Sequence, residues 1–192
     1  MRKTFATFRF GVAAPFYPQN YTPQRFPHTK ALSLKEIAVG SSYTDFKGKG
    51  FWARDGQVEV WLYLLVEEIN CIKAPSAWLK KLQEECHIQA TVGFNGCITA
   101  GLDEAIDTEE KRNYILELCQ SALDKLRNQG PNLTVKAEYS YGADGPDIIC
   151  NGADYRIHES YAVEFINLLN GKVTTNASTS SMVWPSDVPY GS

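Results

Sequence analysis

Apolar residues recur at helical spacing between residues 56 and 71. They fall three or four positions apart and share one helix face: Val58, Trp61, Leu62, Leu65, Val66 and Ile69. The Asp55-Gly56 dipeptide between apolar runs is instead typical of a hairpin turn. Because the helical spacing is sustained from Val58 to Ile69, we predict a helix over about 56–71.

Three further helices are predicted by the same periodicity and by local start and stop signals. A short helix at 76–86 follows Pro75, which interrupts the preceding chain. A longer one at 108–128 has a capping-box-like start, Asp107 with Glu110, and ends before Gly130-Pro131. The last helix is expected at 159–169.

Alternating apolar and polar positions predict strands between these helices. The expected strands are residues 4–12, 31–39, 88–94, 97–100, 133–141 and 148–150. Asn95-Gly96 is a favoured two-residue hairpin turn, so residues 87–101 are interpreted as strand, turn and strand. Residues 43–50 are predicted to be a polar loop.

The order of these elements predicts an α+β fold, in which a mainly antiparallel sheet carries the helices on one face. We assign residues 1–171 to a single domain. Thr, Ser, Asn and Ala make up almost all of residues 174–181, a composition typical of linkers. Residues 172–192 are therefore predicted to form a linker and flexible tail.

A proline-rich segment near the start of the chain carries candidate partner-binding residues. Four prolines between residues 14 and 30 exclude a regular helix or a central strand there. Tyr17, Tyr21 and Phe26 lie among these prolines. Aromatic side chains are common anchors of protein interfaces, so we place them among the candidate contacts.

Composition and charge narrow the classes of partner. The 192 residues carry 19 basic and 22 acidic side chains, a net charge of −3, so nucleic acid is not the expected partner. No apolar run approaches the roughly 18 residues of a membrane span, and no membrane partner is expected. Arg9 interrupts the only apolar stretch resembling a secretory signal, which predicts a cytoplasmic protein.

Cysteine and histidine spacing gives little support for a metal or a cysteine nucleophile. The five cysteines are widely and irregularly spaced, which favours reduced and mostly buried thiols. Cys86-His87 with Cys97 is the nearest approach to a zinc cluster, but neighbours on an extended chain point to opposite faces. We therefore expect no catalytic residues, metal or cofactor.

Acidic turns late in the chain offer a second set of candidate contacts: Asp144, Asp147 and Asp154. Asp147 followed by Asp154-Tyr155-Arg156 also mimics the order of acids and cation in metal-dependent nucleases. Arg stands where such sites carry Lys, and the two acids are close in sequence. Aspartate and glycine are also common turn formers, so we assign these acids to turns that contact a basic partner.

The opening Thr4-Phe5-Ala6-Thr7-Phe8-Arg9-Phe10 is similar to the first strand of an uncharacterised bacterial α+β domain family, which begins aromatic-x-x-Phe-Arg-Ile. Trp52, the helix at 56–71 and the segment from Ala77 to Leu82 also resemble that family's layout, over residues 4–141. Small acidic proteins of this kind resemble the immunity proteins of polymorphic-toxin systems. This resemblance implies a non-enzymatic cytoplasmic inhibitor that occludes a cognate protein toxin or effector.

Two alternatives stay open from the sequence. One is a metal-dependent phosphodiesterase or nuclease that uses the acidic pair. The other is a phage-encoded interaction protein, in which the tail with Trp184-Pro185 docks as a tethered peptide.

Overall fold

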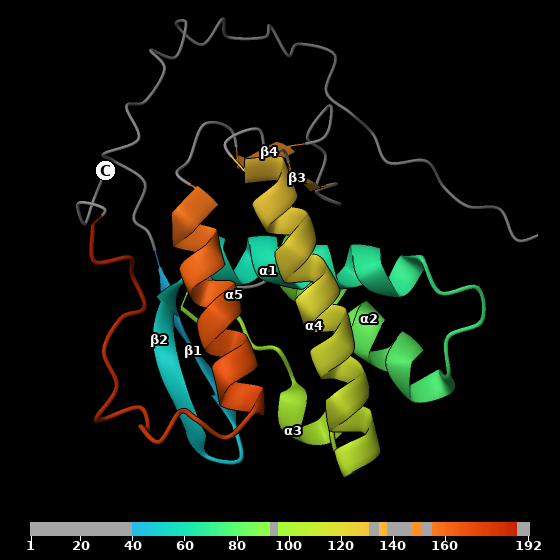
Figure 1. Cartoon of the computed structure of the whole chain (residues 1–192), viewed down its shortest axis with the longest axis horizontal. Coiled ribbons are helices and arrows are strands. Elements are labelled where there is room, and N and C mark those ends of the chain that lie inside the picture. The colour runs from blue at the N-terminus through green and yellow to red at the C-terminus, as the bar shows by residue number, and fades with distance from the viewer. Residues whose placement is uncertain (1–39, 93–95, 131–134, 138–146, 151–154, 188–192) are drawn as a thin grey trace, which may run out of the picture. The chain divides into compact units, whose positions relative to one another are not determined.

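The computed structural model describes residues 40–92, 96–130, 135–137, 147–150 and 155–187 (Figure 1). These residues belong to one compact unit, Ile37–Ser192. The strands predicted at 4–12 and 31–39 lie outside the described residues, as does the proline-rich segment.

The described residues form an α+β fold in which helices predominate. The elements in chain order are β1 (Ser41–Phe46), β2 (Lys49–Arg54), α1 (Asp55–Asn70), α2 (Ala77–Val92), α3 (Leu102–Ala105), α4 (Glu109–Gln129), β3 (Val135–Ala137), β4 (Asp147–Cys150) and α5 (Tyr155–Leu169). Strands β1 and β2 pair antiparallel, and so do β3 and β4. The predicted fold class and antiparallel pairing are confirmed, although both sheets are small.

The β1–β2 hairpin corrects the prediction of a polar loop at 43–50. Lys47 and Gly48 form its turn, both with positive φ (53° and 71°), as the favoured two-residue hairpin turns require. Ser42, Thr44 and Phe46 point to the buried face. The alternation of apolar and polar residues that predicts a strand is missing here, because two of the three inward residues of β1 are polar.

Helix α1 lies at the centre of the core, as its composition dictates. Apolar side chains are buried on several sides of it, which is typical of a helix surrounded by protein. Trp61 of α1 packs edge-on against Tyr161 and Phe165 of α5. The prediction of a helix rather than a hairpin over 56–71 is confirmed.

Helices α4 and α5 confirm two further predictions and refine their starts. Thr108, and not Asp107, caps α4, because its hydroxyl accepts a hydrogen bond from the Lys111 N–H. Helix α5 begins at Tyr155, earlier than the predicted residue 159. The predicted strands near its start are confirmed in part, since β3 lies within 133–141 and β4 spans Asp147–Cys150.

The hairpin predicted at 87–101 is wrong. Residues 87–92 continue α2, and residues 97–100 are not in a strand. Buried Cys86 and Ala90 extend the apolar stripe of Leu79 and Leu82 at helical spacing. This continued burial explains why residues 87–92 are helical and do not form the first strand of the predicted hairpin.

The segment after α5, predicted to be a linker and tail, lies against β2 as far as it is described. The Trp52 indole N–H donates to the carbonyl of Ala177, and the Val183 N–H donates to the carbonyl of Trp52. Both contacts join residues far apart in sequence. Among the described helices, none has the length and apolar character needed to cross a bilayer.

Candidate binding surface around Trp78

Trp78 stands in the first turn of α2, where the chain re-enters a helix after Pro75. The side chain is only partly buried, although Leu79 beside it is a core residue. Helical geometry explains the contrast, because adjacent residues point about 100° apart. Trp78 is thereby directed to the side of α2 that faces α4.

Two side chains of α4 meet the Trp78 ring. The Tyr114 ring packs edge-on at 6.1 Å between centroids, and its side chain remains 37% exposed. The Lys111 ammonium lies 5.4 Å from the Trp78 ring centroid, within the range of a cation–π contact. Lys111 and Tyr114 are three residues apart, so α4 presents both on one face.

Asp107 fixes the position of the Lys111 cation. The Lys111 Nζ atom lies 2.8 Å from one Asp107 carboxylate oxygen and 2.9 Å from the other. This hydrogen bond lowers the pKa of the Asp107 carboxyl, and the nearby positive charge acts in the same direction. The Asp107 carboxylate therefore positions the Lys111 side chain beside the Trp78 ring.

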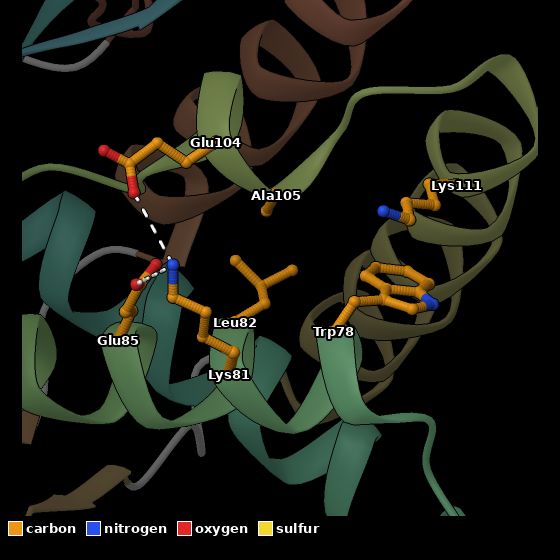
Figure 2. A pocket seen from close by; sticks show the side chains of 7 residues that line it. All are labelled: Trp78, Lys81, Leu82, Glu85, Glu104, Ala105 and Lys111. Carbon is orange, nitrogen blue, oxygen red and sulfur yellow. Dashed lines mark ion pairs between the residues drawn. The ribbon is translucent and has the colours of Figure 1, made fainter.

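A small hollow opens beside Trp78, between α2, α3 and α4 (Figure 2). Lys81 crosses it, with its Nζ atom 3.5 Å from Glu85 and 3.7 Å from Glu104. Leu82 is buried beneath these charged groups. A volume of about 40 Å³ accommodates a few water molecules but not a metabolite-sized ligand.

The residues of this surface are better suited to contacting another macromolecule than to catalysing a reaction. Its exposed part combines two aromatic rings with fixed positive and negative side chains. Aromatic residues surrounded by polar and charged groups are typical of the centres of protein interfaces. We call Trp78, Lys81, Lys111 and Tyr114 the Trp78 surface.

A separate polar cluster at the start of α1 is buried and structural. Asp55 accepts hydrogen bonds from the Ser42 hydroxyl (2.6 Å) and the Gly96 N–H (2.8 Å). The Ser42 oxygen in turn accepts the Ile98 N–H at 2.9 Å. These bonds satisfy the carboxylate and join β1, α1 and the segment after α2.

The prediction of mostly buried thiols holds for two of the four described cysteines, because Cys86 and Cys119 lie in the core whereas Cys71 and Cys97 are exposed. Burial raises the pKa of Cys86 to about 12 and raises the pKa of Cys119 as well, so neither thiol is an activated nucleophile. His87 and Cys97 are exposed, whereas Cys86 is buried, so these three do not form one site. Within the described ranges, no three histidine, cysteine or acidic side chains converge as metal ligands.

Most of the predicted contact residues lie outside the described part of the chain. This applies to Tyr17, Tyr21, Phe26, Asp144 and Asp154. Asp147 opens β4, where it pairs with Ala137. The Asp147–Asp154 pair and the aromatic segment therefore stay predictions.

Sequence reasoning identified Trp78 only as an apolar helix residue. Its amphipathic helix did carry a signal, because Lys81 lies three residues after Trp78 and places the tryptophan at the edge of the apolar face. Lys111 and Tyr114 are more than 30 positions away in sequence, so their contact with Trp78 depends on how α2 packs near α4.

Comparison with known proteins gives no relative for this chain. No protein-family model, no curated protein and no solved structure matches it.

Proposed function

We propose that the protein is a non-enzymatic cytoplasmic binding protein that acts by occluding a protein partner. The observation that carries this proposal is the Trp78 surface. Trp78 and Tyr114 expose aromatic area without large side-chain disorder, because each ring packs against the other. Pre-positioned aromatic anchors of this kind contribute much of the binding energy in protein interfaces.

The charged groups support the same proposal. Lys81 and Lys111 each pair with carboxylates of their own chain, so the surface presents both signs of charge and no strong field. Such pairs select a complementary partner and add little affinity of their own. An immunity or inhibitor protein is the class we favour, with a bacterial toxin or effector as the partner.

Affinity capture with matched variants tests this function. The tagged full chain, Trp78→Ala, Tyr114→Ala and Ile88→Ala are each used to capture proteins from the organism that encodes the chain. Ile88 is the control, because it is an exposed apolar residue of α2 (52% exposed) that does not line the hollow.

We expect one protein to be retained at stoichiometric amounts by the unaltered chain and by Ile88→Ala. Trp78→Ala or Tyr114→Ala should weaken its binding about 30-fold, the effect of losing about 2 kcal/mol at an interface anchor. Tyr114 is more exposed than Trp78, so Tyr114→Ala disturbs the fold less. It shows whether weaker binding by Trp78→Ala results from the surface itself or from misfolding. Equal capture by all four proteins, or no stoichiometric partner at all, would contradict the proposal.

A further inference from the structure

Strand β2 is paired on both of its backbone edges. On one edge it pairs antiparallel with β1, with Tyr43 opposite Trp52. On the other, the Gly50 N–H donates to the Thr175 carbonyl at 2.9 Å, and the Trp52 carbonyl accepts the Val183 N–H at 2.8 Å. Residues 174–187, which we call the strap, thus cover an edge that would otherwise be open to another chain.

Side chains make the fit between strap and edge specific. The Trp52 indole N–H donates to the Ala177 carbonyl at 2.9 Å, and the Thr175 hydroxyl donates to the Gly50 carbonyl at 2.9 Å. Beyond the bridge at Trp52, the Arg54 guanidinium lies 4.6 Å from the Trp184 ring. The edge therefore recognises this sequence through its backbone, an aromatic ring and a cation.

The strap is nevertheless peripheral. Every residue from 174 to 187 is at least partly exposed, and Val173 is the last buried residue before it. Between α5 and the strap, residues 170–172 are exposed and Val173 is buried; Gly171 has a φ of +71°, which glycine readily adopts. The strap meets the core at Val183, which packs against the buried cluster and whose carbonyl accepts a hydrogen bond from Gln57 Nε2 of α1 at 3.4 Å. A strap from a second copy would restore both contacts.

We propose that the β2 edge accepts the strap of a second copy of this chain, so that two copies exchange straps and form a dimer. The second copy supplies the same sequence, so every hydrogen bond described above is remade between chains. Exchange of an identical segment is a low-cost route to dimers, because the bonds lost within one chain are regained between two. A high protein concentration favours the dimer, because two chains must meet to exchange straps. A low concentration favours the closed monomer, because each chain's own strap is tethered close to its β2 edge.

A labelled peptide comprising residues 174–187 tests the edge directly by fluorescence anisotropy. It is titrated into the full chain and into full-length Val183→Pro, which lacks the N–H that donates to Trp52. A tethered strap competes at an effective concentration of about millimolar, so the peptide should bind Val183→Pro at least about tenfold more tightly. Val183→Ala retains the N–H and is the matched control.

The same substitutions in the peptide complete the test. The Val183→Ala peptide should keep most of its affinity for the Val183→Pro chain, and the Val183→Pro peptide should lose it. Equal binding of the natural and Val183→Pro peptides, or equal binding of the natural peptide to both chains, would overturn the proposal.

Sedimentation velocity of the unaltered full chain provides a second measurement that does not depend on a variant. We expect a dimer fraction that grows with protein concentration and that an excess of the natural peptide converts to monomer. A chain that stays monomeric up to about millimolar concentration would overturn the proposal. A dimer that the peptide leaves intact would overturn it as well.

Discussion

Asp55 shows at the scale of one residue how a polar side chain specifies this fold. It is 4% exposed, and it accepts hydrogen bonds from β1 and from the segment that follows α2. Loss of a buried acceptor of this kind lowers the free energy of unfolding mainly because it leaves two buried donors without a partner.

Replacement of Asp55 by alanine should therefore destabilise the protein by about 2–4 kcal/mol, because the Ser42 hydroxyl and Gly96 N–H lose their acceptor. Urea unfolding of the variant measures the change. Glu84→Ala is the control, since Glu84 is exposed on α2 and its loss should change stability by less than about 0.5 kcal/mol. Similar losses for the two variants would show that the Asp55 cluster has no special role.

His158 makes stability depend on pH. Burial lowers the pKa of His158 to about 4, compared with 6.5 for an unperturbed histidine. The unfolded chain therefore takes up a proton between pH 6.5 and about 4 that the folded chain does not. Above pH 6.5, His158 does not reduce the free energy of unfolding. As pH falls from 6.5 to about 4, the free energy of unfolding decreases by about 3 kcal/mol, at 1.36 kcal/mol per pKa unit.

Unfolding free energies measured at several pH values between 4 and 7 test this account. His158→Gln should reduce the acid-side decline in stability, whereas His87→Gln should not, because His87 is exposed. An unchanged pH dependence in His158→Gln would show that other groups cause the decline.

At the scale of the element, hydrophobic spacing predicted α1, α4 and α5, ended α2 at residue 86 instead of Val92, and missed the β1–β2 hairpin. Helices α1, α4 and α5 each carry a sustained apolar stripe, which is a local property of the sequence. Strand β1 carries Ser42 and Thr44 inward, and these residues are buried only because Asp55 and Tyr161 provide hydrogen-bond partners. Partners so distant in sequence leave no local signal.

Gly40, directly before β1, and Gly56, in the first turn of α1, give a matched pair of variants. A Cβ at Gly40 would overlap an Asp55 carboxylate oxygen and lie 2.8 Å from Gly96 N, whereas one at Gly56 would meet no atom within 4 Å. Gly40→Ala should cost about 2 kcal/mol or more. Gly56→Ala should stabilise the protein by about 0.5–1 kcal/mol, because alanine has the higher helix propensity.

Thermal or urea unfolding of both glycine variants measures these opposite effects. The two changes add the same methyl group, so a difference in sign isolates the environment of each position. Stabilisation by Gly40→Ala would contradict the close approach of Gly40 to Asp55.

At the scale of the whole molecule, the sequence predicted the class of fold but not the candidate site. The α+β class follows from local patterns that occur along the chain. The Trp78 surface requires α2 and α4 to pack so that residues 78, 111 and 114 meet. Periodicity assigns a residue to a face of its own helix and gives no information about which other helix that face meets.

Hydrogen exchange of the full chain, with and without its captured partner, tests the central claim most directly. If the Trp78 surface binds the partner, backbone amides in residues 76–85 and 102–114 should exchange more slowly in the complex than in the free protein. Ile88→Ala should show the same protection. A stable complex in which these residues exchange at their free rates, with protection confined to other segments, would contradict the account.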